Sequence, residues 1–331
     1  MRCAVMGAGA WGTALADLLA ANGHAVHLWA FERDVVAAIN DTHQNPLFLP
    51  GFALDARLKA DTDQSEVLSG AELVIYATPS QHLRGIARAG AAHVPKSAVV
   101  AVASKGIEEK TLALMSDVVV QELGRHEVVA VSGPSFAAEV AAKQPTAIVA
   151  ASASAHGARL TQEALSSAAF RVYTHDDLIG VELGGALKNV MAVASGIVEG
   201  VGLENNSRAA LITRGLAEMT RLGVALGARG STFAGLAGIG DLVLTCTGAL
   251  SRNRAVGVEI GQGKTLEQAL AGKTTVAEGV FTSRSALALA EREGVEMPIV
   301  KMVNRILFEG LLARKAVPEL MARGLRAEQD A

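Results

Sequence analysis

Two charged residues stand in segments where packing alone would favour an apolar side chain. Lys188 lies in the small, apolar run GGALKNV (184–190), where we expect the amine to be partly desolvated. Desolvation lowers the pKa of an ammonium group and can prepare it as a general base near neutral pH. Asp241 stands between a glycine pair and an apolar run, and a buried carboxylate there needs a cation such as Lys188 as its partner. On spacing alone, a lysine whose amine reaches solvent along its helix explains Lys188 equally well.

Polar residues also follow two apolar runs that read as buried strands. The tripeptide Ser104-Lys105-Gly106 directly follows one of them, and Gly133 and Ser135 follow the next. Ligands in open α/β sheets lie beyond the carboxyl ends of the strands, so Lys105, Gly133 and Ser135 are expected to face one crevice. Ser135 is also suited to cap the helix that comes after it.

The segment SRNR (251–254) predicts a phosphate site. Ser251 reads as a helix N-cap, so Arg252 and Asn253 occupy the first helical turn. Backbone N–H groups, a guanidinium and an amide at one helix start form a good cradle for a phosphate. A capped helix on the protein surface is the alternative when this segment is considered by itself.

The segment GAGAWG (7–12) predicts a dinucleotide site, because it follows a short apolar run and opens a helical segment. Gly7, Gly9 and Gly12 permit a tight turn and a close approach to a pyrophosphate. The helix start supplies N–H groups and positive potential to the same group. An incidental glycine-rich turn is the alternative.

The choice between NAD and NADP stays open in the sequence. Strict use of NAD favours an acidic residue at the end of the second strand, where a carboxylate accepts a hydrogen bond from the ribose 2′-hydroxyl. That strand ends instead at Trp29-Ala30-Phe31, and Glu32 and Arg33 follow. Arg33 could pair with a 2′-phosphate and Glu32 could favour the free hydroxyl, or both could be solvated loop charges.

The elements that must position these residues change in kind near residue 180. Before it, apolar runs alternate with helical segments, which predicts a doubly wound parallel sheet of the Rossmann type. The predicted strands are 3–6, 25–29, 72–77, 98–103, 128–132, 146–151 and 170–173.

After about residue 180 the strand signal disappears, and the rest of the chain predicts an all-α domain. We therefore expect an NAD(P)-binding domain over 1–180 and a helical substrate-binding and catalytic domain over 181–331. The helical signals are the run 182–198, a cap at Ser207 with a stop at Gly227, a capping box at Thr265 and Gln268, the run 282–293, and first-turn prolines at Pro298 and Pro318.

Composition excludes several classes of protein. The formal net charge is −3 without a long basic run, which argues against a nucleic-acid partner. Cys3 and Cys246 lie far apart, and the eight histidines show no ligand pattern, so neither a disulfide framework nor a metal site is indicated. No uncharged apolar run reaches the roughly 18 residues that span a bilayer. A cytoplasmic protein without stable membrane insertion is expected.

At these segments the chain resembles the bacterial-type NAD(P)-dependent glycerol-3-phosphate dehydrogenases. Eight blocks follow the order of that family over almost the whole chain: GAGAWGTALA, ASKGIE, SGPSFAAEV, GVELGGALKNVMA, ALITRGLAEM, AGIGDLVLTC, SRNR and VAEGVFT. The resemblance implies a fold like that of 6-phosphogluconate dehydrogenase. It also implies interconversion of glycerol 3-phosphate and dihydroxyacetone phosphate, with reduction supplying phospholipid synthesis.

The resemblance further implies roles for individual residues. Lys188 would accept the proton of the C2 hydroxyl and return it in the reverse direction, and Lys105 and Asp241 would polarise and orient the reacting groups. Phe31 departs from the basic or polar residue that is frequent in the family. The small phosphorylated substrate would contact Lys105, Gly133, Ser135, Lys188, Asp241, Ser251, Arg252 and Asn253. The residues expected to contact NAD or NADP include the glycines of the turn and Arg33. The full set is Gly7, Gly9, Ala10, Trp11, Gly12, Phe31, Arg33, Lys105, Ala137, Arg252, Val276 and Glu278.

Two other functions fit part of the pattern. A 2-hydroxyacid or 6-phosphogluconate-type dehydrogenase generally places an Asn one helical turn after the Lys, whereas here Asn189 is adjacent to Lys188 and position 192 is Ala. An NAD(H)-binding redox sensor would keep the glycine-rich turn without needing Lys188, Asp241 and Arg252 together. A homodimer is compatible with the apolar character of the helical half.

Overall fold

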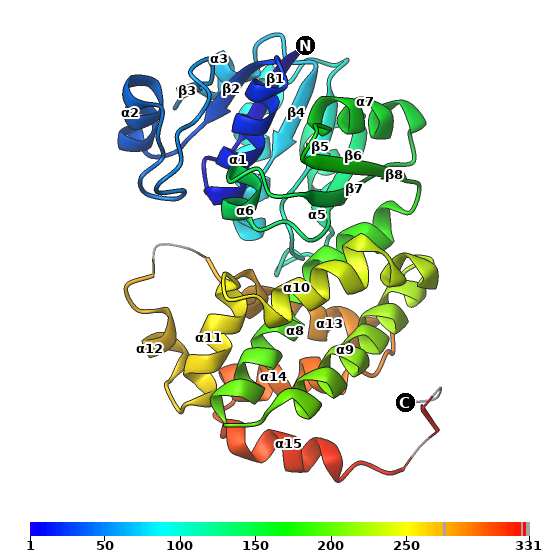
Figure 1. Cartoon of the computed structure of the whole chain (residues 1–331). Coiled ribbons are helices and arrows are strands. Elements are labelled where there is room, and N and C mark those ends of the chain that lie inside the picture. The colour runs from blue at the N-terminus through cyan, green and yellow to red at the C-terminus, as the bar shows by residue number, and fades with distance from the viewer. Residues whose placement is uncertain (274–275, 326, 329–331) are drawn as a thin grey trace.

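The chain has a half that contains a sheet and a half that is helical (Figure 1). The computed structural model describes residues 1–273, 276–325 and 327–328. Eight strands lie in the first half of the described chain: β1 (Arg2–Met6), β2 (Ala25–Trp29), β3 (Lys59–Asp61), β4 (Leu73–Tyr76), β5 (Val99–Val102), β6 (Glu127–Ser132), β7 (Thr146–Ala151) and β8 (Phe170–His175).

These strands form one sheet in the order β3-β2-β1-β4-β5-β6-β7-β8. All neighbouring pairs are parallel except β6 and β7, which are antiparallel. The strand order reverses at β1, which pairs with β2 on one side and β4 on the other. Open α/β sheets bind ligands beyond the carboxyl ends of the strands at such a reversal.

Side chains that alternate along the strands supply an apolar core on each face of the sheet. In β1, Cys3 and Val5 enter one core, and Ala4 and Met6 enter the other. The first face is covered by α1 (Ala10–Ala21), α2 (Arg33–Thr42), α6 (Ala137–Ala141) and α7 (Ala155–Leu165). The second face is covered by α3 (Gln64–Leu68), α4 (Leu83–Gly90) and α5 (Met115–Leu123), with the short turns η1 (Ser80–His82) and η2 (Ala91–His93) beside α4.

The predicted fold class is confirmed, and the seven predicted strands are present with small shifts at their ends. Two details of the sheet were predicted wrongly. The sequence analysis missed β3, because this edge strand has three residues and no apolar run. The prediction of a parallel sheet fails between β6 and β7, because an antiparallel strand that is covered on both faces shows the same apolar run as a parallel one.

The second half is built around α8 (Leu178–Gly200), which is the central helix in the lower part of Figure 1. The helices that contact it are α9 (Asn205–Ala225), α10 (Asp241–Thr247), α11 (Arg252–Gly261), α13 (Glu278–Arg292) and α14 (Pro298–Phe308). Both α12 (Leu266–Leu270) and α15 (Ala313–Met321) pack against α11. Two short turns, η3 (Gly230–Ala234) and η4 (Leu236–Gly240), connect α9 to α10.

By length and composition α8 could cross a membrane, yet 94% of its most apolar stretch is buried inside the fold. A helix that is apolar on all sides needs neighbours on all sides, and the surrounding helices supply them. This helix is therefore the core of the second half.

Close contact between α8 and α11 depends on glycine. A Cβ atom on Gly196 would lie 2.0 Å from the carbonyl oxygen of Arg254, and one on Gly257 would lie 2.1 Å from that of Val193. Any side chain at either position would push the two backbones apart. The crossing places the start of α11 against the middle of α8.

Several predicted helix ends can be compared with the structure. The capping box of Thr265 and Gln268 is confirmed, and Pro298 occupies the first turn of α14 as predicted. The prediction for Pro318 is wrong, because α15 already begins at Ala313 and the proline lies inside it.

Two predicted caps are also wrong. The cap at Ser207 is displaced, because α9 begins at Asn205 with Glu204 at its N-cap. Ser135 does not cap α6, whose N-cap is Phe136. The hydroxyl of Ser135 donates instead to the carbonyl oxygen of Gly133 at 3.1 Å.

Candidate active site

Lys105, Lys188 and Asp241 form one cluster where the two halves meet. Lys105 Nζ donates to Asp241 Oδ2 at 2.6 Å, and Lys188 Nζ lies 2.9 Å from Asp241 Oδ1. Lys188 is 7% exposed and Asp241 is 1% exposed, so this ion pair is shielded from bulk water. The pairing expected between Lys188 and Asp241 is confirmed, and the amine does not reach solvent along its helix.

Each member of the cluster comes from a different element. Lys188 lies in the middle of α8, and Lys105 lies in the loop that follows β5. Asp241 is the first residue of α10 and follows the π-helical turn η4. Irregular turns of this kind are frequent at functional sites, because they aim a side chain differently from a regular helix.

The cluster holds two positive charges against one negative charge. Burial lowers the pKa of Lys188 to about 8, while Asp241 opposes this effect and Lys105 adds to it. Burial would raise the pKa of Asp241, but the two ammonium groups outweigh burial and hold the pKa below its ordinary value. Lys188 can therefore exchange a proton close to neutral pH, and the excess positive charge can stabilise an oxyanion.

Thr245 belongs to this cluster, although the sequence analysis gave it no role. Its hydroxyl accepts from Lys188 Nζ at 2.7 Å and lies 2.7 Å from the carbonyl oxygen of Asp241, one helical turn earlier. The i, i+4 spacing of Asp241 and Thr245 places both on one face of α10. That spacing is the signal that could have identified Thr245.

Gly133 and Ser135 lie beside Lys105, at the carboxyl end of β6. The carbonyl oxygen of Gly133 accepts from Lys105 Nζ at 3.1 Å. The structure thus brings together the two loops that the sequence analysis assigned to one crevice.

The start of α11 has the predicted cap. Ser251 Oγ accepts from the N–H of Arg254 at 3.2 Å, which confirms Ser251 as the N-cap. Arg252 is exposed in the first turn. A helix start leaves its first N–H groups without partners inside the helix, so these groups and the guanidinium can bind an anion.

The Asn253 side chain, in contrast, is buried and bound within the protein. Its Nδ2 donates to Asn189 Oδ1 at 2.9 Å, and its Oδ1 accepts from the N–H of Gly279 at 2.9 Å. These bonds attach α11 to α8 and α13. Asn189, the neighbour of Lys188 in the sequence, thereby helps to position the start of α11, which carries Arg252.

The segment 7–12 forms the turn between β1 and α1, and its geometry fits a pyrophosphate. Gly7 has a φ of 118°, and a Cβ atom on Gly12 would lie 1.8 Å from the carbonyl oxygen of Gly7. A Cβ atom on Gly9 would instead meet nothing within 4 Å, and no side chain of the described residues caps α1. The first N–H groups of α1 therefore face open space, as anion binding requires.

Ala10, Trp11 and Ala137 lie around this turn. Ala10 and Trp11 are in the first turn of α1, and Ala137 begins α6, which packs against α1. Within the described part of the chain, Trp11 Nε1 is buried without a hydrogen-bond partner. A buried donor without a partner is suited to a polar atom of a bound ligand.

Phe31 and Arg33 line an open hollow beyond the end of β2. Phe31 is 80% exposed, and Arg33 is exposed at the start of α2. An exposed aromatic ring can stack on a nucleobase, and a guanidinium can bind a phosphate. The other residues around the hollow are Trp29, Thr62, Asp63, Gln64, Ser65, Ala89 and His93.

Val276 is half-buried just before α13, and Glu278 is the first residue of that helix. The carboxylate of Glu278 accepts from the N–H of Ser80 at 3.0 Å and from its hydroxyl at 2.5 Å. Burial raises the pKa of Glu278, while the hydrogen bonds from Ser80 and the charge of Arg252 oppose this effect. Glu278 thus connects α13 to the loop after β4.

Comparison with known proteins covers both halves of the chain. The family described as NAD-dependent glycerol-3-phosphate dehydrogenase N-terminus matches residues 2–158, and its C-terminus counterpart matches residues 177–318. The chain is similar to the NAD(P)+ glycerol-3-phosphate dehydrogenase of Citrifermentans bemidjiense, with 53% identity over 99% of this chain and 98% of the relative. For the enzyme of the same name from Trichlorobacter lovleyi, the identity is 54% over 99% of this chain and 100% of the relative.

A solved structure supports the same assignment. The crystal structure of glycerol-3-phosphate dehydrogenase from Coxiella burnetii has a TM-score of 0.94 to this chain at 41% identity, and the match covers 97% of this chain and 99% of that one. The matched region includes the Lys188 cluster, the glycine-rich turn and the start of α11, since the matches span nearly the whole chain. The chain belongs to the NAD-dependent glycerol-3-phosphate dehydrogenase family.

Proposed function

We propose that this glycerol-3-phosphate dehydrogenase uses Lys188 to accept the proton of the C2 hydroxyl during oxidation and to return it during reduction. The observation that carries the proposal is the cluster of the buried Lys188 and Asp241 with the partly buried Lys105, between the sheet and the helical half. In oxidation, the O–H bond of C2 breaks as Lys188 takes the proton, and the C2–H bond breaks as hydride leaves. Bound NAD(P)+ supplies the acceptor for that hydride.

The protonation state of Lys188 suits both directions of the reaction. With a pKa of about 8, the amine is mostly protonated near neutral pH, which is the form that reduction requires. The neutral form that oxidation requires becomes abundant above about pH 8. The protonated amine therefore suits reduction of dihydroxyacetone phosphate near neutral pH. From the family we infer that reduction is the direction in the cell and that it supplies glycerol 3-phosphate for phospholipid synthesis.

In reduction, negative charge develops on the carbonyl oxygen while hydride arrives at C2. Lys105 and Lys188 together exceed the charge of Asp241 by one, so they stabilise that oxygen in a site with little water. Asp241 orients both amines. Gly133 and Ser135 border the same position and are suited to hold the substrate there.

The phosphate of the substrate is assigned to the start of α11. The Arg252 guanidinium and the first N–H groups of this helix offer charge and donors away from the reacting carbon. Binding at a remote group orients a short substrate for reaction. Ser251 and Asn253 support this position, the first as the N-cap and the second by holding α11 in place.

The dinucleotide is assigned to the turn of Gly7, Gly9 and Gly12, where the start of α1 faces open space. Trp11 and Ala137 flank that turn, and the hollow beside Phe31 and Arg33 is suited to the adenosine end. Val276 and Glu278 complete the side formed by α13. Two nearly equal Kd values for NADPH in wild type and Arg33→Ala would contradict a role of Arg33 at a 2′-phosphate.

Three further properties are part of the proposal. A boundary near residue 180 fits the change from β8 to α8, and a reducing cytoplasmic location fits the free cysteines Cys3 and Cys246.

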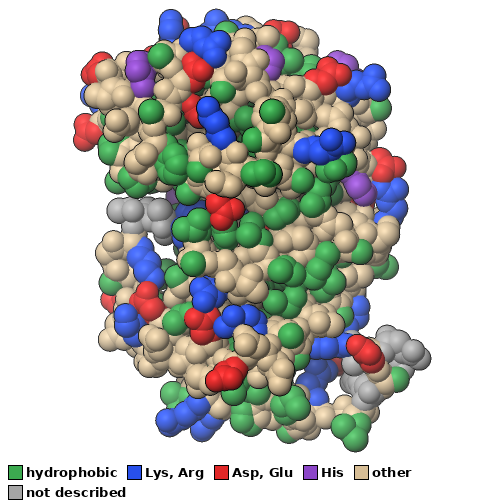
Figure 2. Space-filling model, in the orientation of Figure 1, with side chains coloured by type: hydrophobic (Ala, Val, Ile, Leu, Met, Phe, Trp, Pro, Cys, Tyr) green, Lys and Arg blue, Asp and Glu red, His purple; other side chains and the backbone are tan. Residues whose placement is uncertain are grey.

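A homodimer is supported by exposed apolar side chains on the helical half, including Val224 and Val243. Figure 2 shows hydrophobic side chains gathered over α9 and α10 on the face in view. Sedimentation of the purified protein tests the dimer.

The role of Lys188 is tested with Lys188→Met, which keeps the length of the side chain and removes its charge and proton. We expect kcat for reduction of dihydroxyacetone phosphate to fall by at least about a hundredfold, while the Kd of NADH and NADPH changes little. Lys301→Met on the exposed surface of α14 is the control. Full activity of Lys188→Met would refute the proposal.

A further inference from the structure

Two hydrogen-bonded links with the same geometry join the helical half to the sheet half. In one, Glu278 Oε1 accepts from the N–H of Ser80 and Oε2 accepts from its hydroxyl, at 3.0 and 2.5 Å. In the other, Glu182 Oε1 accepts from the N–H of Ser116 and Oε2 accepts from its hydroxyl, at 2.8 and 2.5 Å. We call these two links the serine–glutamate clamps.

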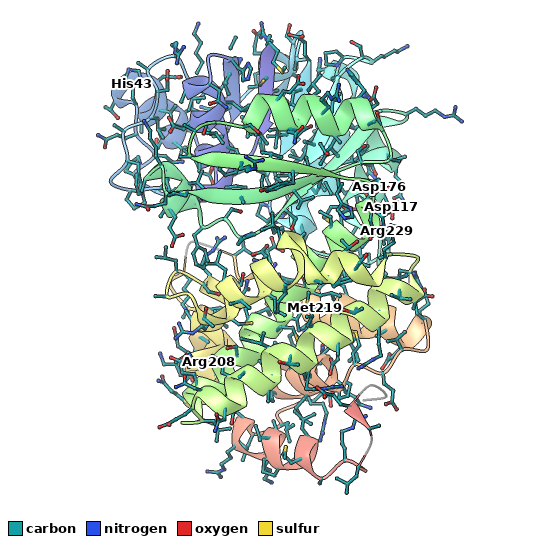
Figure 3. The ribbon with its side chains drawn as sticks, turned by 45° about the vertical axis from the view of Figure 1, so that its right-hand side comes forward. His43, Asp117, Asp176, Arg208, Met219 and Arg229 are labelled. Atoms are coloured by element: carbon teal, nitrogen blue, oxygen red, sulfur yellow. The ribbon has the colours of Figure 1, made fainter. Side chains whose placement is uncertain are left out.

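Each clamp lies where the sheet half contacts the helical half. Both glutamates belong to helices of the second half, α13 and α8. Both serines lie at the start of a helical turn of the first half, η1 and α5, and are 1% and 5% exposed. Figure 3 labels Asp117, the neighbour of Ser116, at the level where the halves meet, near the ion pair of Asp176 and Arg229.

Between the two serines in the structure runs the segment that carries Lys105. A Cβ atom on Gly106 would lie 2.5 Å from the side chain of Ser80, so this segment rests directly on the first clamp. The segment continues to Leu114 and then enters α5 at the second clamp. The polypeptide from 105 to 114 is therefore bounded by a clamp at each end.

The middle of the segment is part of the other half. Ile107 and Leu114 are buried in the hydrophobic core of the helical half, although the chain around them belongs to the sheet half. The carbonyl oxygen of Ile107 accepts from Gln81 Nε2 at 2.9 Å and from Ser285 Oγ on α13 at 3.0 Å. The position of Lys105 thus depends on how the helical half holds this segment.

Glu182 also lies on the face of α8 that carries the active site. A Cβ atom on Gly185, three residues later, would lie 2.5 Å from Ser132 Oγ and 3.5 Å from the side chain of Lys105. Lys188 follows after another three residues. Residues three apart on a helix share a face, so a shift of α8 at Glu182 would displace Lys188 relative to Lys105.

We propose that Ser80 and Ser116, through Glu278 and Glu182, are positioning residues that hold the segment 105–114 so that Lys105 meets Asp241. The serines touch neither the amines nor the carboxylate of the cluster, and they act through the place of Lys105. This inference rests on the proposed role of Lys105 in the reaction. Small displacements of a catalytic group are costly, since about 1 Å of misplacement can reduce the rate by about a hundredfold.

The test uses the full-length enzyme and the variants Ser80→Ala, Ser116→Ala and the double variant. Each single change removes one hydroxyl donor and leaves the backbone donor in place. We expect kcat for reduction of dihydroxyacetone phosphate to fall several-fold in each single variant and at least about tenfold in the double variant. Hydrogen exchange of amides in 106–114 is expected to accelerate in the same variants.

The matched control is Ser154→Ala. The hydroxyl of Ser154 also donates to a glutamate, Glu127, and Ser154 also lies at a helix start, but both residues belong to the sheet half. This variant is expected to lose thermal stability and to keep kcat within about twofold of wild type, because Ser154 lies outside the clamps. A general effect of losing a serine–glutamate bond would instead lower kcat in all three single variants.

Lys105→Met separates positioning from structure. If the serines act through Lys105, the double serine change lowers kcat in the wild-type background and adds little in Lys105→Met. Additive losses of kcat would refute the proposed action of the clamps through Lys105 and leave the role of Lys105 itself intact. An unchanged kcat in the double serine variant, beside an impaired Lys105→Met, would have the same consequence. An unchanged kcat in Lys105→Met would refute the proposed role of Lys105 and the inference that depends on it.

Discussion

Replacing Asp241 by Asn removes one negative charge and keeps the shape of the side chain. In the wild type this carboxylate lies 2.6 Å from Lys105 Nζ and 2.9 Å from Lys188 Nζ. In Asp241→Asn the two ammonium groups would face each other without a counter-ion. Both the loss of attraction and the remaining repulsion favour a neutral Lys188, so its pKa must fall below the value of about 8.

The size of that fall follows from Coulomb's law. At the 2.9 Å that separates Lys188 Nζ from Asp241 Oδ1, with an effective dielectric constant of about 20, the attraction amounts to about 6 kcal/mol. This corresponds to an upper limit of roughly four pH units. Water entry and movement of the two amines reduce the effect, and we expect the pKa of Lys188 to fall by about two to three pH units.

The fall in pKa has opposite consequences for the two directions of the reaction. At about pH 7 the protonated fraction of Lys188 would drop from about nine tenths to between about one and ten per cent. Reduction needs the protonated amine, so its kcat should fall by about ten- to a hundredfold at this pH. For oxidation, the neutral amine becomes available at lower pH, although as a weaker base.

The assay is the initial rate at saturating substrate in both directions, from about pH 5 to pH 9. The wild type should lose reductive kcat as pH rises through about 8, whereas Asp241→Asn should lose it two to three pH units lower. Asp176→Asn is the matched control, because Asp176 pairs with Arg229 at an exposed position. An Asp241→Asn profile whose descending limb stays near pH 8 would refute this account of the cluster.

Four other substitutions test three separate parts of the molecule. Arg252→Ala should raise KM for dihydroxyacetone phosphate by about ten- to a hundredfold through loss of a charged contact, and an equal loss for unphosphorylated dihydroxyacetone would contradict the phosphate site. Gly12→Ala should lower the unfolding temperature, because its Cβ would lie 1.8 Å from a backbone oxygen, whereas Gly9→Ala should keep that temperature and weaken NAD(P)H binding measured by titration. Burial raises the pKa of Glu218 to about 7, although hydrogen bonds from two backbone N–H groups act to lower this pKa. Its raised pKa means that Glu218 stabilises the fold at low pH and that this contribution is lost as pH rises through about 7. In Glu218→Gln, the decrease in unfolding free energy between about pH 5 and pH 8 should be smaller than in wild type by roughly 2 kcal/mol; denaturant titrations with equal decreases would contradict it.

Much of the fold could be predicted from the sequence, because it depends on interactions between near neighbours. Seven strands were recognisable as short apolar runs, which are typical of a parallel sheet, and their alternation with helices indicated the sheet. The glycine-rich turn could be located because its backbone excludes a Cβ atom at Gly7 and Gly12. Caps such as Ser251 and Thr265 are also local, since a side chain there bonds to an N–H group three residues later.

The features that the sequence analysis missed depend on the environment of an element. β3 is too short to show a pattern, and it exists because β2 offers it a free edge. The direction of β7, antiparallel to β6 and parallel to β8, is visible only in how the three strands pair. Pro318 could be accommodated inside α15 because that helix begins earlier than its proline suggested.

The candidate site divides in the same way. The sequence by itself determined which residues carry charge in apolar surroundings, and it paired Lys188 with Asp241 because a buried carboxylate needs a cation. Only the tertiary structure decided that Lys105 shares that carboxylate from 136 positions away. It also decided that Thr245 accepts a hydrogen bond from Lys188 Nζ and that the Asn253 side chain is bound inside the protein. The clamp at Ser80 joins residues 198 positions apart. Local propensity acts over a few residues, whereas contacts at such separations arise only when the whole chain has buried its apolar surface, and that balance cannot be read from any one segment.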